Sequence, residues 1–117
     1  MKNIIKLEEM AMFAFSAYAL YFLKADWWWY LILLIGPDIS MLGYLAGDKA
    51  GAICYNLFHH KAVGILITAI GIFSGNWVLD VIGVIIFGHS CMDRMFGYGL
   101  KYFEGFKFTH LGKIGKN

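Results

Sequence analysis

Long apolar runs alternate with short polar breaks along this chain of 117 residues. The apolar runs cover residues 9–23, 27–46, 51–74 and 77–97. Each run is close to the length that a helix needs to cross about 30 Å of hydrocarbon. The breaks between them are short, so successive helices should be antiparallel neighbours. The pattern predicts an all-α fold, namely an integral membrane four-helix bundle with up-down-up-down topology.

The composition supports a membrane environment. Hydrophobic residues make up 60% of the chain and charged residues only 15%. A soluble domain of this length needs more polar surface, because a small protein exposes a large fraction of its area. The net charge of +2 is small and its lysines are dispersed, which gives no support for a nucleic-acid partner. We therefore expect one transmembrane domain over residues 1–117, with the lipid bilayer as its main partner.

Lysine and arginine placement predicts the orientation of the helices. The N-terminal flank carries Lys2 and Lys6, and the second break carries Lys49. The segment 98–117 holds four more lysines, whereas the opposite side has only Lys24. Positive residues favour the cytoplasmic side, so both termini should be cytoplasmic and residues 98–117 should form an interfacial tail. The expected location is the cell inner membrane, which the chain would cross several times.

Lys61 complicates the third run, because it lies about ten residues inside it. A lysine at that depth must snorkel, pair with an acid or line a polar cavity. In an alternative division of the sequence, residues 47–61 form an interfacial segment and the span starts near Ala62. We favour the longer span, since residues 62–74 alone are too short to cross the bilayer.

Two glycine pairs have the spacing that allows close helix contact in lipid. They are Gly47/Gly51 and Gly71/Gly75. Both pairs also border predicted breaks, where glycines commonly cap helices. The sequence alone leaves both roles open.

Every predicted helix carries an ionisable or strongly polar group in its cytoplasmic half. Counted along the helices, these groups are Glu9, Asp38, Asn56 with His59, and His89 with Asp93. His89 and Asp93 are four residues apart and share a helix face. Pro37 removes a backbone donor just before Asp38, so a kink there should free carbonyl groups beside the carboxylate. Such groups are costly in lipid and tend to mark functional sites.

Histidine and carboxylate side chains from several helices are what a metal site in a bundle core requires. The candidate metal ligands are Asp38, His89, Asp93 and one of the adjacent histidines His59 and His60. Nitrogen and oxygen donors without thiolates suit divalent zinc, manganese or iron. Glu9 is the predicted general base, and Asn56 is predicted to orient water or substrate.

Each of these residues also has a purely structural interpretation. Glu9 would be a solvated residue at the interface, and Asp93 would be neutralised by the adjacent Arg94. Asp38 would pair with His59 or Lys61 and join two helices.

Several motifs resemble those of a small bacterial membrane family known as domain of unknown function 4260. They are PDISMLGY at 37–44, YNxxH at 55–59, HxxxDR at 89–94, GYGLKY at 97–102 and THLG at 109–112. The resemblance implies that His59, rather than His60, is the functional histidine. It also implies that the C-terminal GYGLK and THLG segments are part of the fold rather than a frayed tail, and it brings no established activity.

Three functions fit these observations. The first is a membrane-embedded metal-dependent hydrolase of a lipid-like substrate. The second is a cation or proton-coupled carrier or channel, which would need a homo-oligomer because four helices are few for a transporter. The third is a non-catalytic membrane subunit or small-molecule binding module, in which the polar groups serve assembly.

Overall fold

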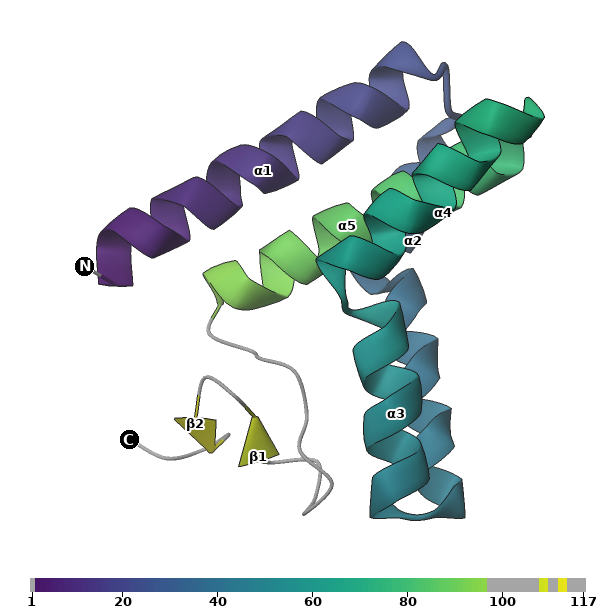
Figure 1. The fold of residues 1–117 in the computed structure, drawn as a ribbon. Coiled ribbons are helices and arrows are strands. Elements are labelled where there is room, and N and C mark those ends of the chain that lie inside the picture. Colours follow the sequence, from purple (N-terminus) through teal and green to yellow (C-terminus); the bar gives the residue numbers. More distant parts are fainter. Residues whose placement is uncertain (1, 97–107, 110–111, 114–117) are drawn as a thin grey trace.

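The computed structural model describes residues 2–96, 108–109 and 112–113 (Figure 1). The helices are α1 (Lys2–Phe22), α2 (Trp27–Ile35), a 3₁₀ helix η1 (Gly36–Ala46), α3 (Asp48–Phe58), α4 (Lys61–Ser74) and α5 (Trp77–Met95). Two short strands, β1 (Phe108–Thr109) and β2 (Gly112–Lys113), pair antiparallel. Apart from this hairpin the described chain is helical, which confirms the prediction of an all-α fold. Most of the predicted interfacial tail lies outside the described residues.

The second and third apolar runs are each divided by a break. Pro37 stands at the start of η1, where its missing N–H ends the α-helical hydrogen bonding of α2. The third run bends by 53° between α3 and α4. His60 caps the new helix, since its Nδ1 accepts a hydrogen bond from the Ala62 amide at 3.1 Å. Lys61, which lies inside the third apolar run of the sequence, is thus the first residue of α4.

The two breaks place half-helices in two groups (Figure 1). α3 packs along η1 to form an arm that points away from the other helices. α1 and α4 both pack against α5, and α2 also contacts α5. The breaks therefore lie where the arm meets the three longer helices.

One helical segment of the described chain, Trp27–Ala46, is long and apolar enough to cross a membrane. The bent pair of α3 and α4 is a second candidate if the two helices form one span. Only 17% of the first segment is buried, unlike the core helix of a soluble protein. α1 and α5 carry more charges, among them Glu9 in α1 and Asp93 in α5.

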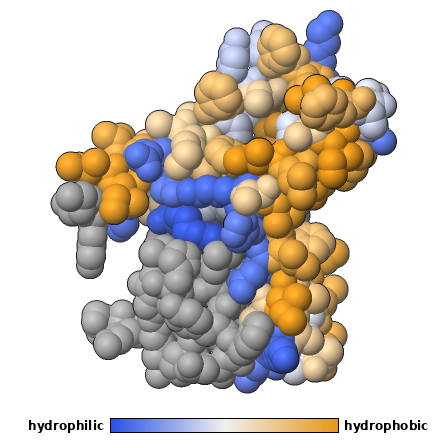
Figure 2. Space-filling model, in the orientation of Figure 1, coloured by the Kyte–Doolittle hydropathy of each residue, from blue (hydrophilic) through white to orange (hydrophobic). Residues whose placement is uncertain are grey.

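The surface of the described residues is apolar, and much of the interior is polar. Large apolar side chains such as Phe22, Leu45 and Phe73 are exposed. Figure 2 shows apolar residues over much of one face, and a band of hydrophilic residues beside the grey atoms. The buried polar and charged residues are Glu9, Ser16, Ser40, His59, His89, Ser90 and Asp93. This distribution reverses that of soluble proteins and is typical of helices in lipid.

Glycines let α4 and α5 approach closely. A Cβ atom added at Gly64 would lie 2.7 Å from the Phe87 amide nitrogen, and one at Gly83 would lie 2.5 Å from the Thr68 amide nitrogen. Backbone atoms cannot swing aside as side chains do. The contact between the two helices therefore depends on both positions having no side chain.

The two predicted glycine pairs divide their roles. Gly51 packs against the Tyr44 ring and Gly71 against Asp80, both too closely for a Cβ atom. Gly47 and Gly75 have φ angles of +114° and +67° and cap helix ends. One member of each pair thus serves helix contact and the other serves the turn.

Gly64→Leu should lower the free energy of unfolding by about 2 kcal/mol, because the new side chain must push α4 away from α5. Ala62→Leu is the matched control, since Ala62 is an exposed residue near the start of the same helix. Thermal denaturation in detergent measures both variants. Equal stability of the two would contradict the close packing of α4 on α5.

Candidate metal centre

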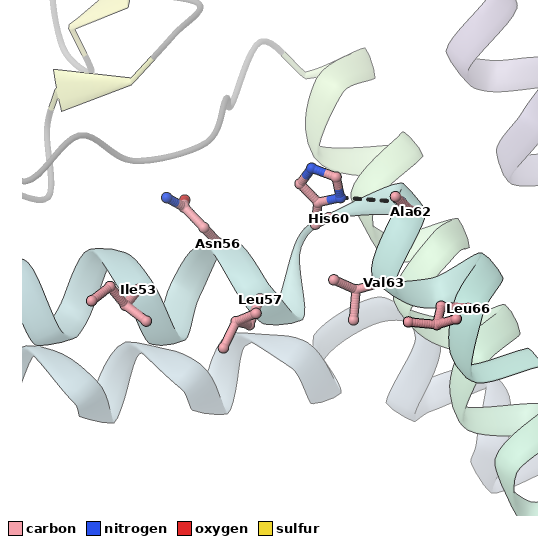
Figure 3. Close-up of a pocket in the computed structure, with 7 residues that line it drawn as sticks. All are labelled: Ile53, Asn56, Leu57, His60, Ala62, Val63 and Leu66. Carbon is pink, nitrogen blue, oxygen red and sulfur yellow. Dashed lines mark hydrogen bonds between the residues drawn. The ribbon is translucent and has the colours of Figure 1, made fainter. Parts of the chain in front are cut away.

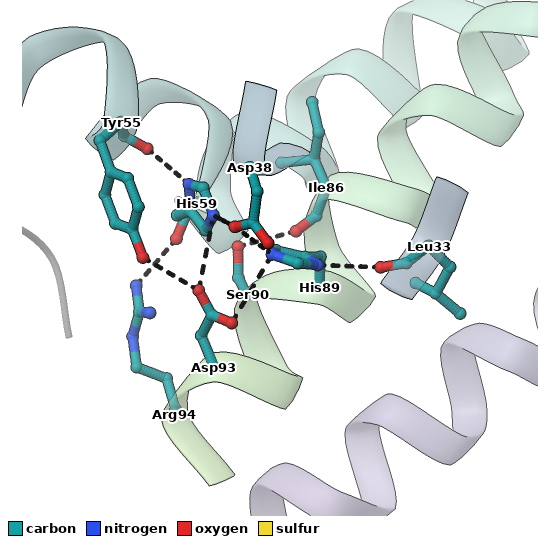
Figure 4. Close-up of polar contacts among 9 residues, drawn as sticks. All are labelled: Leu33, Asp38, Tyr55, His59, Ile86, His89, Ser90, Asp93 and Arg94. Atoms are coloured by element: carbon teal, nitrogen blue, oxygen red, sulfur yellow. Dashed lines mark hydrogen bonds and ion pairs between the residues drawn. The ribbon is translucent and has the colours of Figure 1, made fainter. Parts of the chain in front are cut away.

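Four side chains converge where the two helix breaks meet α5 (Figure 4). Asp38 lies in the first turn of η1, and His59 is the residue that ends α3. His89 and Asp93 are one turn apart on α5. One ligand atom from each residue lies within 4.8 Å of those of the other three, so the group could hold a metal ion.

The separations between these atoms suit a small coordination shell. Asp38 Oδ1 lies 3.0 Å from His59 Nε2 and 3.1 Å from His89 Nε2. Asp93 Oδ2 lies 3.5 Å from His59 Nε2, and Asp93 Oδ1 lies 3.6 Å from His89 Nε2. A tetrahedral zinc ion with bonds of about 2.0–2.1 Å holds its ligand atoms about 3.3 Å apart. The four separations lie on either side of that value.

Both histidine rings are oriented by backbone carbonyl groups. His59 Nδ1 lies 2.8 Å from the Tyr55 carbonyl oxygen, and His89 Nδ1 lies 2.9 Å from that of Leu33. A carbonyl oxygen only accepts hydrogen bonds, so each Nδ1 carries the proton and donates it. The neutral ring then has its lone pair on Nε2, which points at the centre of the cluster. This is the arrangement found around metal-binding histidines.

The helix breaks explain why these carbonyl groups are available. The Leu33 carbonyl would bond to the amide four residues later, but that residue is Pro37, which has no N–H. The Tyr55 carbonyl loses its helical partner because the His59 amide bonds to the Asn56 carbonyl instead, at 3.3 Å. Each break thus frees one acceptor, and each acceptor orients one histidine.

Two further side chains support the cluster. The Tyr55 hydroxyl donates to Asp93 Oδ2 at 3.1 Å, and its ring stacks on His59 with ring centroids 3.8 Å apart. The Arg94 guanidinium donates to the His59 carbonyl oxygen at 2.8 Å. These contacts join the end of α3 to the last turn of α5. They therefore hold His59 and Asp93 in their positions.

The cluster is buried on all sides but one. Both histidine side chains are fully buried and the Asp93 side chain is 10% exposed, whereas that of Asp38 is 40% exposed. Two carboxylates and two ring lone pairs would repel one another at these distances. The site therefore needs a cation at its centre or an extra proton on each ring.

The other two predicted site residues lie elsewhere. Glu9 is 6% exposed and forms an ion pair with Lys61. Asn56 lines a separate apolar groove of about 480 Å³ in the elbow between α3 and α4, together with His60 (Figure 3). Of the predicted residues, the structure thus brings together the four candidate ligands but not Glu9 and Asn56.

Sequence reasoning missed the orienting groups. Tyr55 was noted only as part of a motif, and Leu33 not at all. Their positions carried a signal, because Leu33 lies four residues before the proline and Tyr55 four residues before the histidine.

Comparison with protein families identifies the family of this chain. A family model matches residues 2–114 and is described as Domain of unknown function (DUF4260). The chain belongs to this family. The match confirms the resemblance of the sequence motifs. No curated protein and no solved structure matches this DUF4260 chain.

Tyr55→Phe in this DUF4260 protein should weaken metal binding about tenfold, because Asp93 loses the hydrogen bond that orients it. Tyr18→Phe on the exposed face of α1 is the control and should bind as the wild type does. Competition with a coloured chelator measures both affinities. An unchanged affinity in Tyr55→Phe would show that the Tyr55 hydroxyl does not support metal binding by Asp93.

Proposed function

We propose that the protein is a multi-pass membrane protein that holds one divalent metal ion and hydrolyses an ester or phosphoester bond of a lipid-like substrate. The ligands would be Asp38, His59, His89 and Asp93. The observation that carries the proposal is the orientation of the two buried rings, whose Nε2 atoms face two carboxylates across the space of one ion.

The proposed membrane arrangement has four spans. They are α1, α2 with η1, α3 with α4, and α5, with both termini on the cytoplasmic side of the inner membrane. The exposed apolar surface supports this arrangement. The buried charges support it as well, because Glu9 is paired with Lys61 and Asp93 bonds to Tyr55.

A divalent ion at this position would supply the chemistry that hydrolysis needs. It would polarise the oxygen of an ester or phosphate group and lower the pKa of a bound water. Zinc, manganese and iron all accept nitrogen and oxygen donors of this kind. Asp38 is the half-exposed ligand, so water would reach the ion on its side.

Proton transfer needs an acceptor within hydrogen-bond reach of the attacking water. Asp38 meets this requirement, because Oδ1 faces both histidine rings and leaves Oδ2 to accept a proton. Glu9 is already engaged by Lys61. We therefore assign the role of general base to Asp38 rather than to Glu9, and no step is assigned to Asn56.

The test uses protein reconstituted in vesicles of phosphatidylethanolamine and phosphatidylglycerol, loaded with zinc, manganese or iron. Mass spectrometry of the lipids should show cleavage products that are at background after chelation and in Asp38→Asn. Lipids that stay intact with every metal, in protein shown to bind that metal, would overturn the hydrolase proposal.

One observation favours cation transport as a second candidate. Two discontinuous helices meet at the polar site, as they do in many transporters. Transport predicts that vesicle-entrapped fluorescent chelator reports uptake of Mn²⁺ or Zn²⁺, and that Asp38→Asn abolishes this uptake. Tightly bound metal without any flux would exclude the carrier.

A further inference from the structure

α1 and α4 border an apolar groove whose floor is α5. Both helices pack against α5 but make little contact with each other. The groove has a volume of about 430 Å³, which is in the range of small-molecule sites of about 300–1,000 Å³. Ala19 on α1 and Ala69 on α4 are small residues of the two walls, and Phe87 lies in the floor.

The groove offers no hydrogen bond to an occupant. Its two hydroxyl groups are satisfied within their own helices: Ser16 Oγ donates to the Phe13 carbonyl at 2.6 Å, and Thr68 Oγ1 to the Gly64 carbonyl at 3.0 Å. The remaining lining residues are apolar. A polar occupant would therefore lose its hydrogen bonds to water without replacement, whereas an alkyl chain would lose nothing.

One end of the groove is charged. The Glu9–Lys61 ion pair joins α1 to α4 on the N-terminal side of the lining residues of both helices. From Lys61 to Ile72 the helix rises about 16 Å, which is about half the 30 Å hydrocarbon thickness of a bilayer. The lining residues of α4 cover about 10 Å of this rise, so the groove and its charged end together have the length of one leaflet.

The charged end is linked to the candidate metal centre. The Lys61 side chain is 30% exposed, whereas that of its partner Glu9 is 8% exposed. The Arg94 guanidinium interacts electrostatically with both Glu9 and Asp93. Arg94, which also donates to the His59 carbonyl oxygen, thus links the charged end of the groove to the cluster.

We propose that this groove binds one acyl chain of an amphiphile with an anionic head, and that the head lies at Lys61 and Arg94. Taken with the proposed function, on which this step rests, the occupant is the substrate, and its head group reaches the metal centre. The substrate class is then an anionic acyl lipid with its chain between α1 and α4.

The test is photolabelling with palmitate that carries a diazirine near its methyl end, in phosphatidylcholine nanodiscs. Cross-links should concentrate near Ala69 and Ile72, and unlabelled palmitate should compete. Ala19→Phe fills one wall and should reduce labelling at least fivefold. Ala14→Phe, an exposed alanine of the same helix outside the groove, should label as the wild type does.

Ala69→Phe fills the opposite wall and provides a second test of the groove if Ala19→Phe fails to fold. Bound metal is measured in every sample, because groove filling should leave it unchanged. Labelling spread over all exposed faces, or equal in the filled and control variants, would overturn the groove proposal even with metal bound. Groove-specific labelling in wild-type protein that binds no metal would instead uphold the groove and overturn the proposed function.

Discussion

His89→Ala should bind metal at least about 100-fold more weakly than the wild type and retain less than a tenth of its metal after dialysis. The ring would supply one of the four candidate ligands, and its side chain is fully buried within the cluster, so its loss should remove a quarter of the coordination shell. This loss should exceed the effect of removing an orienting group such as the Tyr55 hydroxyl. Elemental analysis by mass spectrometry measures the metal-to-protein ratio.

His60→Ala is the matched control, because His60 lies next to a ligand in sequence but lines the elbow groove instead. It should keep its metal and lose only the stability that the helix cap contributes, about 1 kcal/mol. If His60→Ala lost as much metal as His89→Ala, the assignment of His59 and His89 as the ligating pair would fail.

Lys61→Met should lower the free energy of unfolding by about 2–3 kcal/mol, because it leaves the buried Glu9 carboxylate without its partner. We expect a loss of stability near the low end of the range for buried ion pairs, since Lys61 is partly exposed. The double variant Glu9→Gln/Lys61→Met removes both charges and should recover most of the loss. Denaturation in mixed detergent micelles measures the three proteins.

Lys6→Met and Glu8→Gln change exposed residues of α1 and serve as controls with little expected effect. A double variant no more stable than Lys61→Met would mean that the ion pair does not account for the loss. Full metal content in Lys61→Met would show that the pair is separate from the metal ligands.

The helices and the four ligands could be predicted because they leave strong local signals. Apolar runs of 15–24 residues between short breaks favour helices over strands. Asp38, His59, His89 and Asp93 were recognisable because charge is rare in such runs. Pro37 also predicted the break in the second run. The Leu33 carbonyl is free because Pro37 has no N–H to bond to it.

The bend at His59 and the surroundings of Glu9 could not be predicted in the same way. No proline or glycine marks the junction of α3 and α4, and its polar residues His59, His60 and Lys61 are compatible with either a continuous span or a break before Ala62. The predicted depth in the membrane placed Glu9 near the candidate ligands. Depth does not determine which face of a helix a side chain lies on. Glu9 interacts with Cys91, which lies two residues from both His89 and Asp93 and so points to another face of α5.

Anomalous diffraction from crystals of metal-loaded protein, at the zinc, manganese and iron edges, distinguishes a metal centre from a cluster of hydrogen-bonded side chains. We expect one peak about 2.0–2.2 Å from the Nε2 atoms of His59 and His89 and from carboxylate oxygens of Asp38 and Asp93. Histidine rings that hydrogen-bond directly to the carboxylates, with no anomalous peak between the four residues, would contradict this expectation.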